Sequence, residues 1–218
     1  MKAYHFIPAK YGLENLKHKR LKIATIPDLN DPFELLCLDL TDKELRIGIM
    51  AWKREMANKF GLLCFSRTWR NPVQWSHYAD KHRGLCLCFE ISDGIAQPVV
   101  YSAKRSIEEA KQLLCTGTSD EEMIKKFLTT KYSHWRYEQE VRVFARLEEL
   151  DPNKEMYFCD FSDSLKLVEV IIGAESTVTR KQIIETLGSM SSIVELRNAR
   201  LAFKSYRVTT QRDKKLWT

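Results

Sequence analysis

The stretch RNPVQWSHYADKHRGLCLCFEI, residues 70–91, joins the signals of a short helix to those of a buried strand. Pro72 suits the first turn of a helix, where its missing N–H is not needed, and Gly84 is typical of a residue that ends one. The run LCLCFEI that follows has the length and apolar character of a buried strand. This stretch predicts a fold in which helices cover a sheet.

Similar patterns on both sides extend the sheet and add helices. Strands are expected at AYHFIP (3–8), RLKIA (20–24), GLLCFS (61–66), YEQEVRVFARL (137–147), LKLVEVIIGAEST (165–177), IVELRN (193–198) and FKSYRVTTQ (203–211). Helices are expected within 12–19, at 41–59 and at 179–190. Another helix is expected to start at a cap formed by Asn30 or Asp31, with Pro32 in its first position. Two more are expected within 105–133, the second capped near Ser119 or Asp120. These elements predict an α+β fold, a curved, mainly antiparallel sheet flanked by helices, in a single domain spanning residues 1–218.

Composition limits the classes of protein to which the chain can belong. It is 44% hydrophobic and 29% charged, and no apolar run approaches the roughly 20 residues of a membrane helix. The start MKAYHFIPAK lacks the apolar core of a signal peptide, so we expect a cytoplasmic protein with no membrane contact. The net charge of +6 favours polyanionic partners only weakly. The six cysteines lie mostly in apolar runs without paired zinc spacing, so we expect free thiols and no metal site.

Polar residues interrupt two of the apolar elements, and each interruption has a structural explanation beside a functional one. His5 lies inside a strand, where a histidine is often a satisfied structural residue. Trp75 and Tyr78 share one face of the helix that follows Pro72. They belong either to a site or to a helix whose tryptophan packs into the core.

The strand YEQEVRVF carries the third polar cluster. Alternation along a strand puts Glu138, Glu140 and Arg142 on one face. These charges could form an exposed ladder with a neighbouring strand, worth a few tenths of a kcal/mol. Otherwise one carboxylate lies in an unusual environment, because like charges on one face repel each other.

Four segments carry a resemblance to a known family. They are AYHFIPAKYGLENLKHKRL (3–21), LNDPFE (29–34), CFSRTWRNPVQWSHYADKHRGLCLCFEI (64–91) and KYSHWRYEQEVRVF (131–144). In this order they resemble an uncharacterised bacterial family, a domain of unknown function related to abortive-infection proteins. The resemblance runs to about Gly173 and implies a role in phage defence without defining a biochemical activity.

A more distant likeness adds a mechanism. The aromatic-histidine start of the first strand, the block RNPVQW (70–75), the late strand EQEV (138–141) and the strand VEVIIG (168–173) are similar to the DarT-type ADP-ribosyltransferases that modify DNA. This resemblance implies an ADP-ribosyltransferase-like fold with Arg70 and Glu140 as the catalytic pair. It also implies NAD as the substrate, held in part by His5.

The types of the neighbouring residues predict which other side chains contact NAD. Besides His5, they are Tyr4, Asn30, Arg67, Trp75, Tyr78 and Glu138. Arginines and a helix N-terminus suit the pyrophosphate, and an aromatic ring can stack on a base. Glu140 is expected beneath the ribose, where a carboxylate stabilises an oxocarbenium-like transition state. Glu138, nearer the start of the strand, is expected to be reached by water.

These features predict an NAD-dependent, ADP-ribosyltransferase-like toxin or phage-defence effector that acts on nucleic acid or protein. The alternative is a non-catalytic module of a defence system that binds a nucleotide or a protein in the same groove. A purely structural protein would leave the strand glutamates solvated and far from His5. For the enzyme we expect His5, Arg70, Trp75 and Glu140 to line one concave site. His5 and Glu140 on opposite faces of the sheet would end the interpretation of this set of residues as a transferase site.

Overall fold

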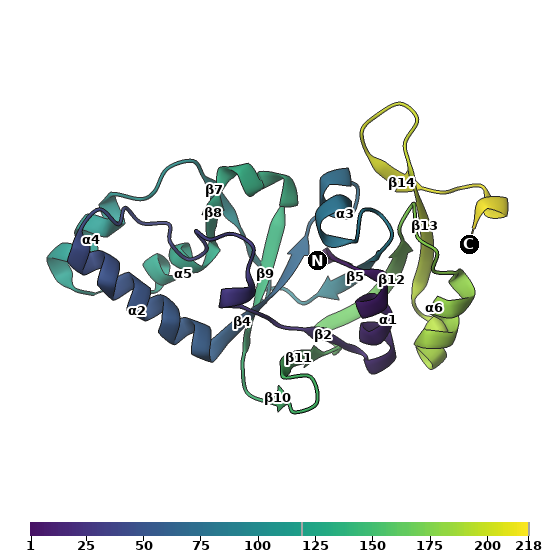
Figure 1. The fold of residues 1–218 in the computed structure, drawn as a ribbon, viewed down its shortest axis with the longest axis horizontal. Coiled ribbons are helices and arrows are strands. Elements are labelled where there is room, and N and C mark those ends of the chain that lie inside the picture. Colours follow the sequence, from purple (N-terminus) through teal and green to yellow (C-terminus); the bar gives the residue numbers. More distant parts are fainter. Residues whose placement is uncertain (119, 218) are drawn as a thin grey trace.

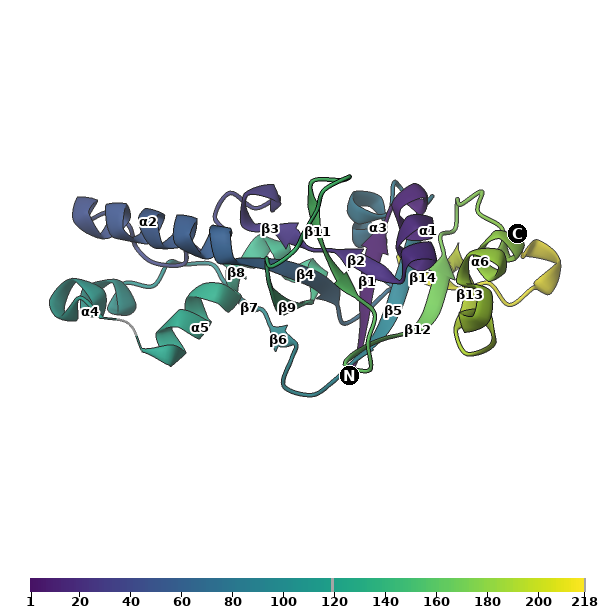
Figure 2. The same ribbon diagram turned by 90° about the horizontal axis from the view of Figure 1, so that it is seen from below.

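The computed structural model describes residues 1–118 and 120–217, which form an elongated molecule. A large sheet occupies its middle (Figure 1). Helices α2 (Lys43–Lys59), α4 (Glu108–Thr116) and α5 (Glu121–Thr129) gather at one end. Helix α6 (Arg180–Leu187) lies at the other end with strands β13 (Glu195–Leu201) and β14 (Val208–Thr210). Figure 2 shows the same separation from below.

The large sheet has nine strands within the described residues. Its order is β14-β13-β12-β5-β1-β4-β9-β6, and β3 pairs with β4 beside this path. The strand bounds are β1 Lys2–Ile7, β3 Ala24–Thr25, β4 Phe60–Ser66, β5 Leu85–Ile91, β6 Gln97–Pro98, β9 Glu140–Arg146 and β12 Leu165–Ile172. The β12–β13 pair is parallel and the other neighbouring pairs are antiparallel. The expectation of a mainly antiparallel sheet is therefore confirmed, and over the described residues the sheet does not close into a barrel.

The two faces of this sheet are covered by different elements. Phe89 of β5 points to the face where it shares a core with Leu16 of α1 (Ala9–His18) and Ile183 of α6. Cys86 points to the opposite face and shares a core with Trp75 of α3 (Pro72–Tyr78). The alternation along β5 thus serves two cores, which explains why the strand is apolar at nearly every position.

Smaller elements complete the fold. They are β2 (Arg20–Lys22), β7 (Val100–Ser102), β8 (Thr130–Tyr132), β10 (Leu150–Asp151), β11 (Met156–Asp160) and the 3-10 helices η1 (Ile26–Asp28), η2 (Ser133–Glu138), η3 (Gly188–Ser192) and η4 (Lys214–Leu216). Strands β10, β11 and β2 form one small sheet, and β7 pairs with β8 in another. No helix in the described ranges combines the length and the apolar character needed to cross a bilayer.

The helical end has a hydrophobic cluster of its own. Ile49 of α2, Ala110 of α4 and Phe127 of α5 belong to it. Asp42 caps α2 and Asp120 caps α5 by accepting backbone N–H groups, as the sequence indicates. The alternative cap, Ser119, lies outside the described residues. Strand β8 follows α5 without a loop, so the position of α5 fixes that of β8. Lys131 of β8 thereby lies next to Glu140 of β9 in the large sheet.

The helix expected from Pro32 is wrong. Residues 32–35 form a turn, in which the Asp31 carboxylate accepts the backbone N–H of Phe33 at 2.9 Å. Leu35 adopts a φ of 60°, which a continuing helix does not allow. The turn directs Glu34 inward, where it is buried.

Several other boundaries differ from the sequence-based prediction. The strand expected at 203–211 is confined to β14, because residues 203–207 form the loop between β13 and β14. Helix α3 ends at Tyr78 and not at Gly84, because Asp80, Lys81 and His82 all have positive φ. The strand expected from Tyr137 starts only at Glu140. Glu138 ends η2, and Gln139 follows it with a φ of 46°. Strand alternation therefore does not relate Glu138 to Glu140.

Candidate functional site

A cavity opens where two strands part along the same edge of β4. Tyr4 of β1 pairs with Ser66 at one end of β4, and β3 pairs with Gly61 and Leu62 near the other. Cys64 and Phe65, between these contacts, line a cavity with about 240 Å³ of space for water-sized molecules. This volume suits a small ligand or one end of a larger one.

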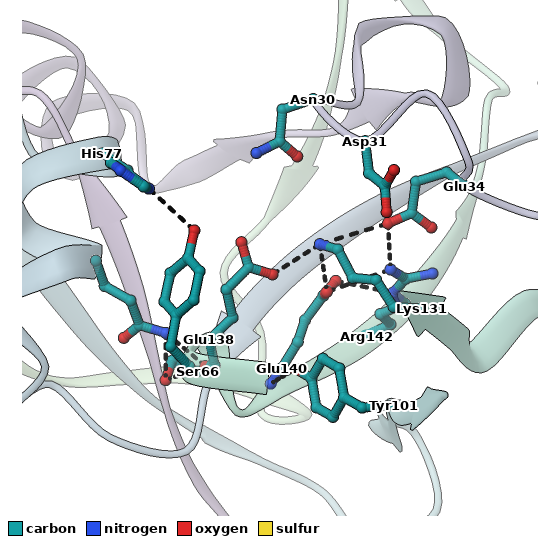
Figure 3. A network of polar contacts seen from close by, with 12 residues as sticks. Asn30, Asp31, Glu34, Ser66, His77, Tyr101, Lys131, Glu138, Glu140 and Arg142 are labelled. Atoms are coloured by element: carbon teal, nitrogen blue, oxygen red, sulfur yellow. Dashed lines mark hydrogen bonds and ion pairs between the residues drawn. The ribbon is translucent and has the colours of Figure 1, made fainter. Parts of the chain in front are cut away.

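A cluster of buried charges forms the floor of the cavity. Glu34, Lys131, Glu138 and Glu140 line the cavity, and Arg142 contacts this floor without lining it. Lys131 of β8 places its Nζ 2.7 Å from a Glu138 oxygen, 2.9 Å from a Glu140 oxygen and 3.4 Å from a Glu34 oxygen. Arg142 of β9 bridges Glu34 and Glu140, at 2.7 and 2.8 Å. Figure 3 shows these side chains pointing toward one another. All five are less than a tenth exposed, so water screens their interactions only weakly.

Glu140 is held in its ionised form. Arg142 donates to it through Nε and Nη2, at 2.8 and 3.2 Å, and Lys131 donates at 2.9 Å. Burial alone would raise the pKa of Glu140, but the charges of Arg142 and Lys131 outweigh it and lower the pKa to about 2. Glu140 is therefore a fixed negative charge at neutral pH.

Glu138 lies in the opposite kind of environment. Burial raises its pKa above the ordinary value, and the attraction of Lys131 only partly offsets this. Besides Lys131, its carboxylate accepts a hydrogen bond from the Tyr78 hydroxyl, which in turn accepts one from the Asn30 amide at 2.7 Å. Two neighbouring carboxylates with pKa values displaced in opposite directions form a pair suited to acid–base chemistry.

Helix α3 fixes the turn that presents Glu138. The Asn71 amide donates to the carbonyl of Tyr137 at 2.8 Å, and the Gln74 amide donates to the carbonyl of Glu138. The Ser66 hydroxyl donates to the same Glu138 carbonyl at 2.7 Å. These bonds explain why Asn71 and Gln74 are polar on a helix that faces the sheet.

The cavity has more acceptors and negative charges than donors and positive charges. Three carboxylates meet two cations in the cluster. Oε2 of Glu34 and Oε1 of Gln74 are buried and have no hydrogen-bond partner among the described residues, and both residues line the cavity. The site is therefore matched to a ligand that is neutral or cationic and rich in hydrogen-bond donors.

Six of the nine residues expected in the site line this cavity. They are Tyr4, His5, Asn30, Tyr78, Glu138 and Glu140. The expectation that water reaches Glu138 is wrong, since the residue is 6% exposed. Arg67, Arg70 and Trp75 do not line the cavity.

His5 borders the cavity without facing the same side as Glu140. Tyr4, Ser66 and Glu140 are cross-strand neighbours and share one face, so alternation puts His5 on the other. There its ring packs edge-on against Phe65, and its Nδ1 lies 3.0 Å from the carbonyl oxygen of Cys64, to which it donates. Burial lowers the pKa of His5, which keeps the imidazole neutral. These contacts are those of a structural histidine. The predicted transferase site that joins His5 to Glu140 is therefore wrong, because the two side chains lie on opposite faces of the sheet.

Trp75 and Arg70 belong to other parts of the molecule. Trp75 is fully buried, packs edge-on against Phe6 and donates its indole N–H to the carbonyl of Trp69 at 2.6 Å. Arg70 lies over the ring of Trp69 and donates to the Thr209 hydroxyl at 3.3 Å. The expectation that Arg70 and Trp75 join Glu140 in one concave site is therefore wrong, because both are engaged on the α3 side toward β14.

Sequence reasoning missed Lys131 and Glu34 as members of the cluster, and it placed Arg142 beside the strand glutamates without predicting that the group is buried. Glu34 ends the segment LNDPFE and Lys131 begins the segment KYSHWRYEQEVRVF, so both lie in segments singled out for other reasons. The signal was the charge of Arg142 within the apolar run VRVF, since a buried guanidinium requires carboxylate partners. The six cysteines are free, and the described residues contain no group of three or more potential ligands arranged to hold a metal ion.

Comparison with known proteins gives one match. A family model with the description "Protein of unknown function (DUF2971)" matches residues 74–143. Neither the search of curated proteins nor the search of solved structures finds a match. The matched segment begins at Gln74 in α3 and contains Lys131, Glu138, Glu140 and Arg142. The segment that matches this family model thus supplies four of the five charged residues in the cluster.

Proposed function

We propose that the cavity binds the nicotinamide–ribose end of NAD and that the protein is an ADP-ribosyltransferase-like enzyme of a toxin or phage-defence system. The observation that carries the proposal is the pair Glu138 and Glu140, which share Lys131 at the cavity but have pKa values displaced in opposite directions. The acceptor of ADP-ribose is nucleic acid or protein.

The chemistry of NAD supports this choice of ligand. The nicotinamide ring of NAD⁺ is a flat cation, which suits a cavity with Tyr4 and Tyr78 on its walls and a surplus of negative charge on its floor. Ribose hydroxyls and the nicotinamide amide are donors that suit the unpartnered oxygens of Glu34 and Gln74. Lys131 and Arg142 are committed to carboxylates, so the pyrophosphate requires contacts outside the cavity.

The proposed reaction transfers a ribosyl carbon. The bond between C1′ and the nicotinamide nitrogen breaks, and its electron pair leaves with nicotinamide. A nucleophilic atom of the acceptor forms the new bond to C1′ and passes its proton to Glu138, the more basic of the two carboxylates. Glu140 remains ionised and stabilises the positive charge that develops on the ribose.

The first assay measures the release of nicotinamide from NAD. A second assay incubates the protein with labelled NAD and cell extract and identifies the polymer that becomes labelled. Glu138→Gln is expected to lower turnover by about 100-fold or more, the order found for loss of a general base. The matched control is Glu185→Gln on α6, where the carboxylate is exposed and paired only with Lys181. Turnover in Glu138→Gln equal to that of the control would contradict the proposed reaction.

A second candidate is the non-catalytic binding module, and one observation favours it. Both carboxylate oxygens of Glu140 already accept bonds from cations, which leaves its charge largely compensated. On this alternative, calorimetry would detect binding of a nucleotide with no product formed over hours. Measurement of nicotinamide release in the same sample therefore distinguishes the enzyme from the binding module.

A further inference from the structure

A basic and aromatic hairpin projects from the end of the molecule opposite α4. Strands β13 and β14 are antiparallel neighbours, and the loop between them contains Phe203 and Tyr206. These side chains are 91% and 99% exposed. Figures 1 and 2 both show this loop standing clear of the sheet. Exposure of two aromatic rings to water on one short loop is unfavourable, and a bound partner that covers the rings would remove this unfavourable contribution.

The loop holds its rings outward through backbone bonds. The N–H of Ala202 donates to the carbonyl of Arg207 at 2.9 Å, and the N–H of Arg207 donates to the carbonyl of Ser205 at 2.9 Å. The guanidinium of Arg200 lies 4.4 Å from the centre of the Phe203 ring. The rings are therefore presented by an ordered turn.

Positive charge surrounds the two rings. Residues 196–217 contain seven lysines and arginines and one acidic residue, Asp213. Among the described residues, Arg200, Lys204 and Arg207 form no ion pair with a carboxylate. Arg70 extends the patch toward α3, since its carbonyl accepts the N–H of Val208 at 2.9 Å. This surface is complementary to a polyanion.

We propose that this hairpin binds single-stranded nucleic acid, with bases stacking on Phe203 and Tyr206 and phosphates contacting Arg200, Lys204 and Arg207. Unpaired bases present flat faces to aromatic rings, and the backbone follows positive charge, which is the general mode of single-strand binding. The proposal concerns a surface separate from the cavity and does not rest on the proposed reaction.

An anionic membrane would also attract basic and aromatic residues, but the surface fits it less well. Membrane-surface elements present a broad apolar face with several large side chains. Here Lys204 and Ser205 separate the two rings, and the Arg200 guanidinium lies near the Phe203 ring. Alternating aromatic and cationic groups fit bases and phosphates that alternate along a strand.

Fluorescence anisotropy with labelled 20-mers of dT and of rU, in about 50 mM salt, tests the proposal directly. We expect binding of at least one of the two single strands, with weaker binding of a duplex of the same length, and the ratio of the two identifies DNA or RNA. The double variant Phe203→Ala/Tyr206→Ala is expected to weaken binding at least tenfold, since each stacked base contributes about 1–3 kcal/mol. Arg200→Gln/Arg207→Gln should lower the dependence of affinity on salt.

The matched control is Tyr11→Ala on α1, an exposed aromatic with Lys10 beside it. It should bind the single strand as the wild type does. Three results would overturn the proposal: no binding of either single strand, tighter binding of the duplex, or equal affinity of the wild type and the double aromatic variant. Binding to vesicles containing phosphatidylserine in place of the oligonucleotides would assign the hairpin to membranes instead.

Discussion

The cavity floor and the β13–β14 hairpin both concentrate charged side chains, but the charges of the floor are buried and paired whereas those of the hairpin loop are exposed and unpaired among the described residues. On the floor, Lys131 and Arg142 are buried and each contacts at least two carboxylates. On the hairpin, Lys204 and Arg207 are exposed and have no carboxylate partner among the described residues. Buried charges are stable only when they are matched, whereas exposed charges tolerate the absence of a partner because water solvates them.

This difference separates what holds the fold from what is available to a ligand. The fold depends on both cations of the floor and on Glu140, since removal of Lys131 or Arg142 would leave buried carboxylates without compensation. The hairpin can lose its charges without harm to the fold and offers them to a partner. Substitution of Lys131, Glu140 or Arg142 is therefore expected to change stability first, and substitution on the hairpin to change binding alone.

The largest expected effect is at Glu140. Glu140→Gln leaves Arg142 buried with one partner fewer, so we expect a loss of about 3–5 kcal/mol in the free energy of unfolding. Glu138→Gln is expected to stay within about 1 kcal/mol of the wild type, because its raised pKa shows that the fold disfavours the ionised carboxylate. Urea unfolding at neutral pH measures both. Equal losses of unfolding free energy in the two variants would contradict the different structural roles given to Glu138 and Glu140.

That contrast decides how the site is tested. The sequence-based expectation gives Glu140→Gln the role of the clean catalytic variant, because it is nearly isosteric. In the structure Glu140 has three bonds to buried cations, so loss of activity in this variant is mixed with loss of fold. Glu138 also lines the cavity, and its substitution is expected to change stability less, so Glu138→Gln is the clearer test of catalysis.

A somewhat smaller effect is expected from acid. The pKa of Glu140 is about 2 in the folded protein against 4.5 ordinarily, so between these values the unfolded chain binds more protons and stability falls as the pH is lowered. The loss is of the order of 3 kcal/mol on complete protonation. The raised pKa of Glu138 acts in the opposite direction, because the folded state then gains stability as that carboxylate is protonated.

Urea unfolding between pH 6 and pH 2 separates the two contributions. Glu138→Gln removes the opposing one, so its stability should decline more steeply with acid than that of the wild type. The exposed pair of Arg197 and Glu195 provides a control, since Glu195→Gln should leave the acid profile unchanged. A decline that is steeper in the wild type than in Glu138→Gln would contradict the assigned directions.

Local sequence signals predicted the framework well, because the physical causes are local. Apolar runs located β4, β5 and β12, and the cap expected at Ser119 or Asp120 located the start of α5. The turn at 32–35 was missed because a proline after an aspartate suits a turn as well as a helix start. The positive φ of Gln139 was missed for a similar reason, since glutamine gives no sign of a left-handed conformation.

The site was only partly predictable, because it depends on contacts between distant segments. Glu138 and Glu140 were found from their charge within an apolar run, Tyr78 was found from its place on the helix after Pro72, and Asn30 was named among the residues expected to contact NAD. Lys131 was not found, since its role depends on the unbroken passage from α5 into β8. Arg70 was misplaced because a short arginine block does not show whether its helix presents that end to the cavity or to β14.

The smallest expected effect is on the stability of the hairpin variants, and it completes the comparison. Phe203→Ala/Tyr206→Ala removes two rings that are almost fully exposed, so the free energy of unfolding should change by less than about 0.5 kcal/mol. The same should hold for Arg207→Gln, whose side chain has no carboxylate partner among the described residues to lose. Urea unfolding with the oligonucleotide absent gives the value. A loss above about 2 kcal/mol would mean that the hairpin supports the fold, and any binding defect in these variants would then follow from unfolding and not from a lost contact.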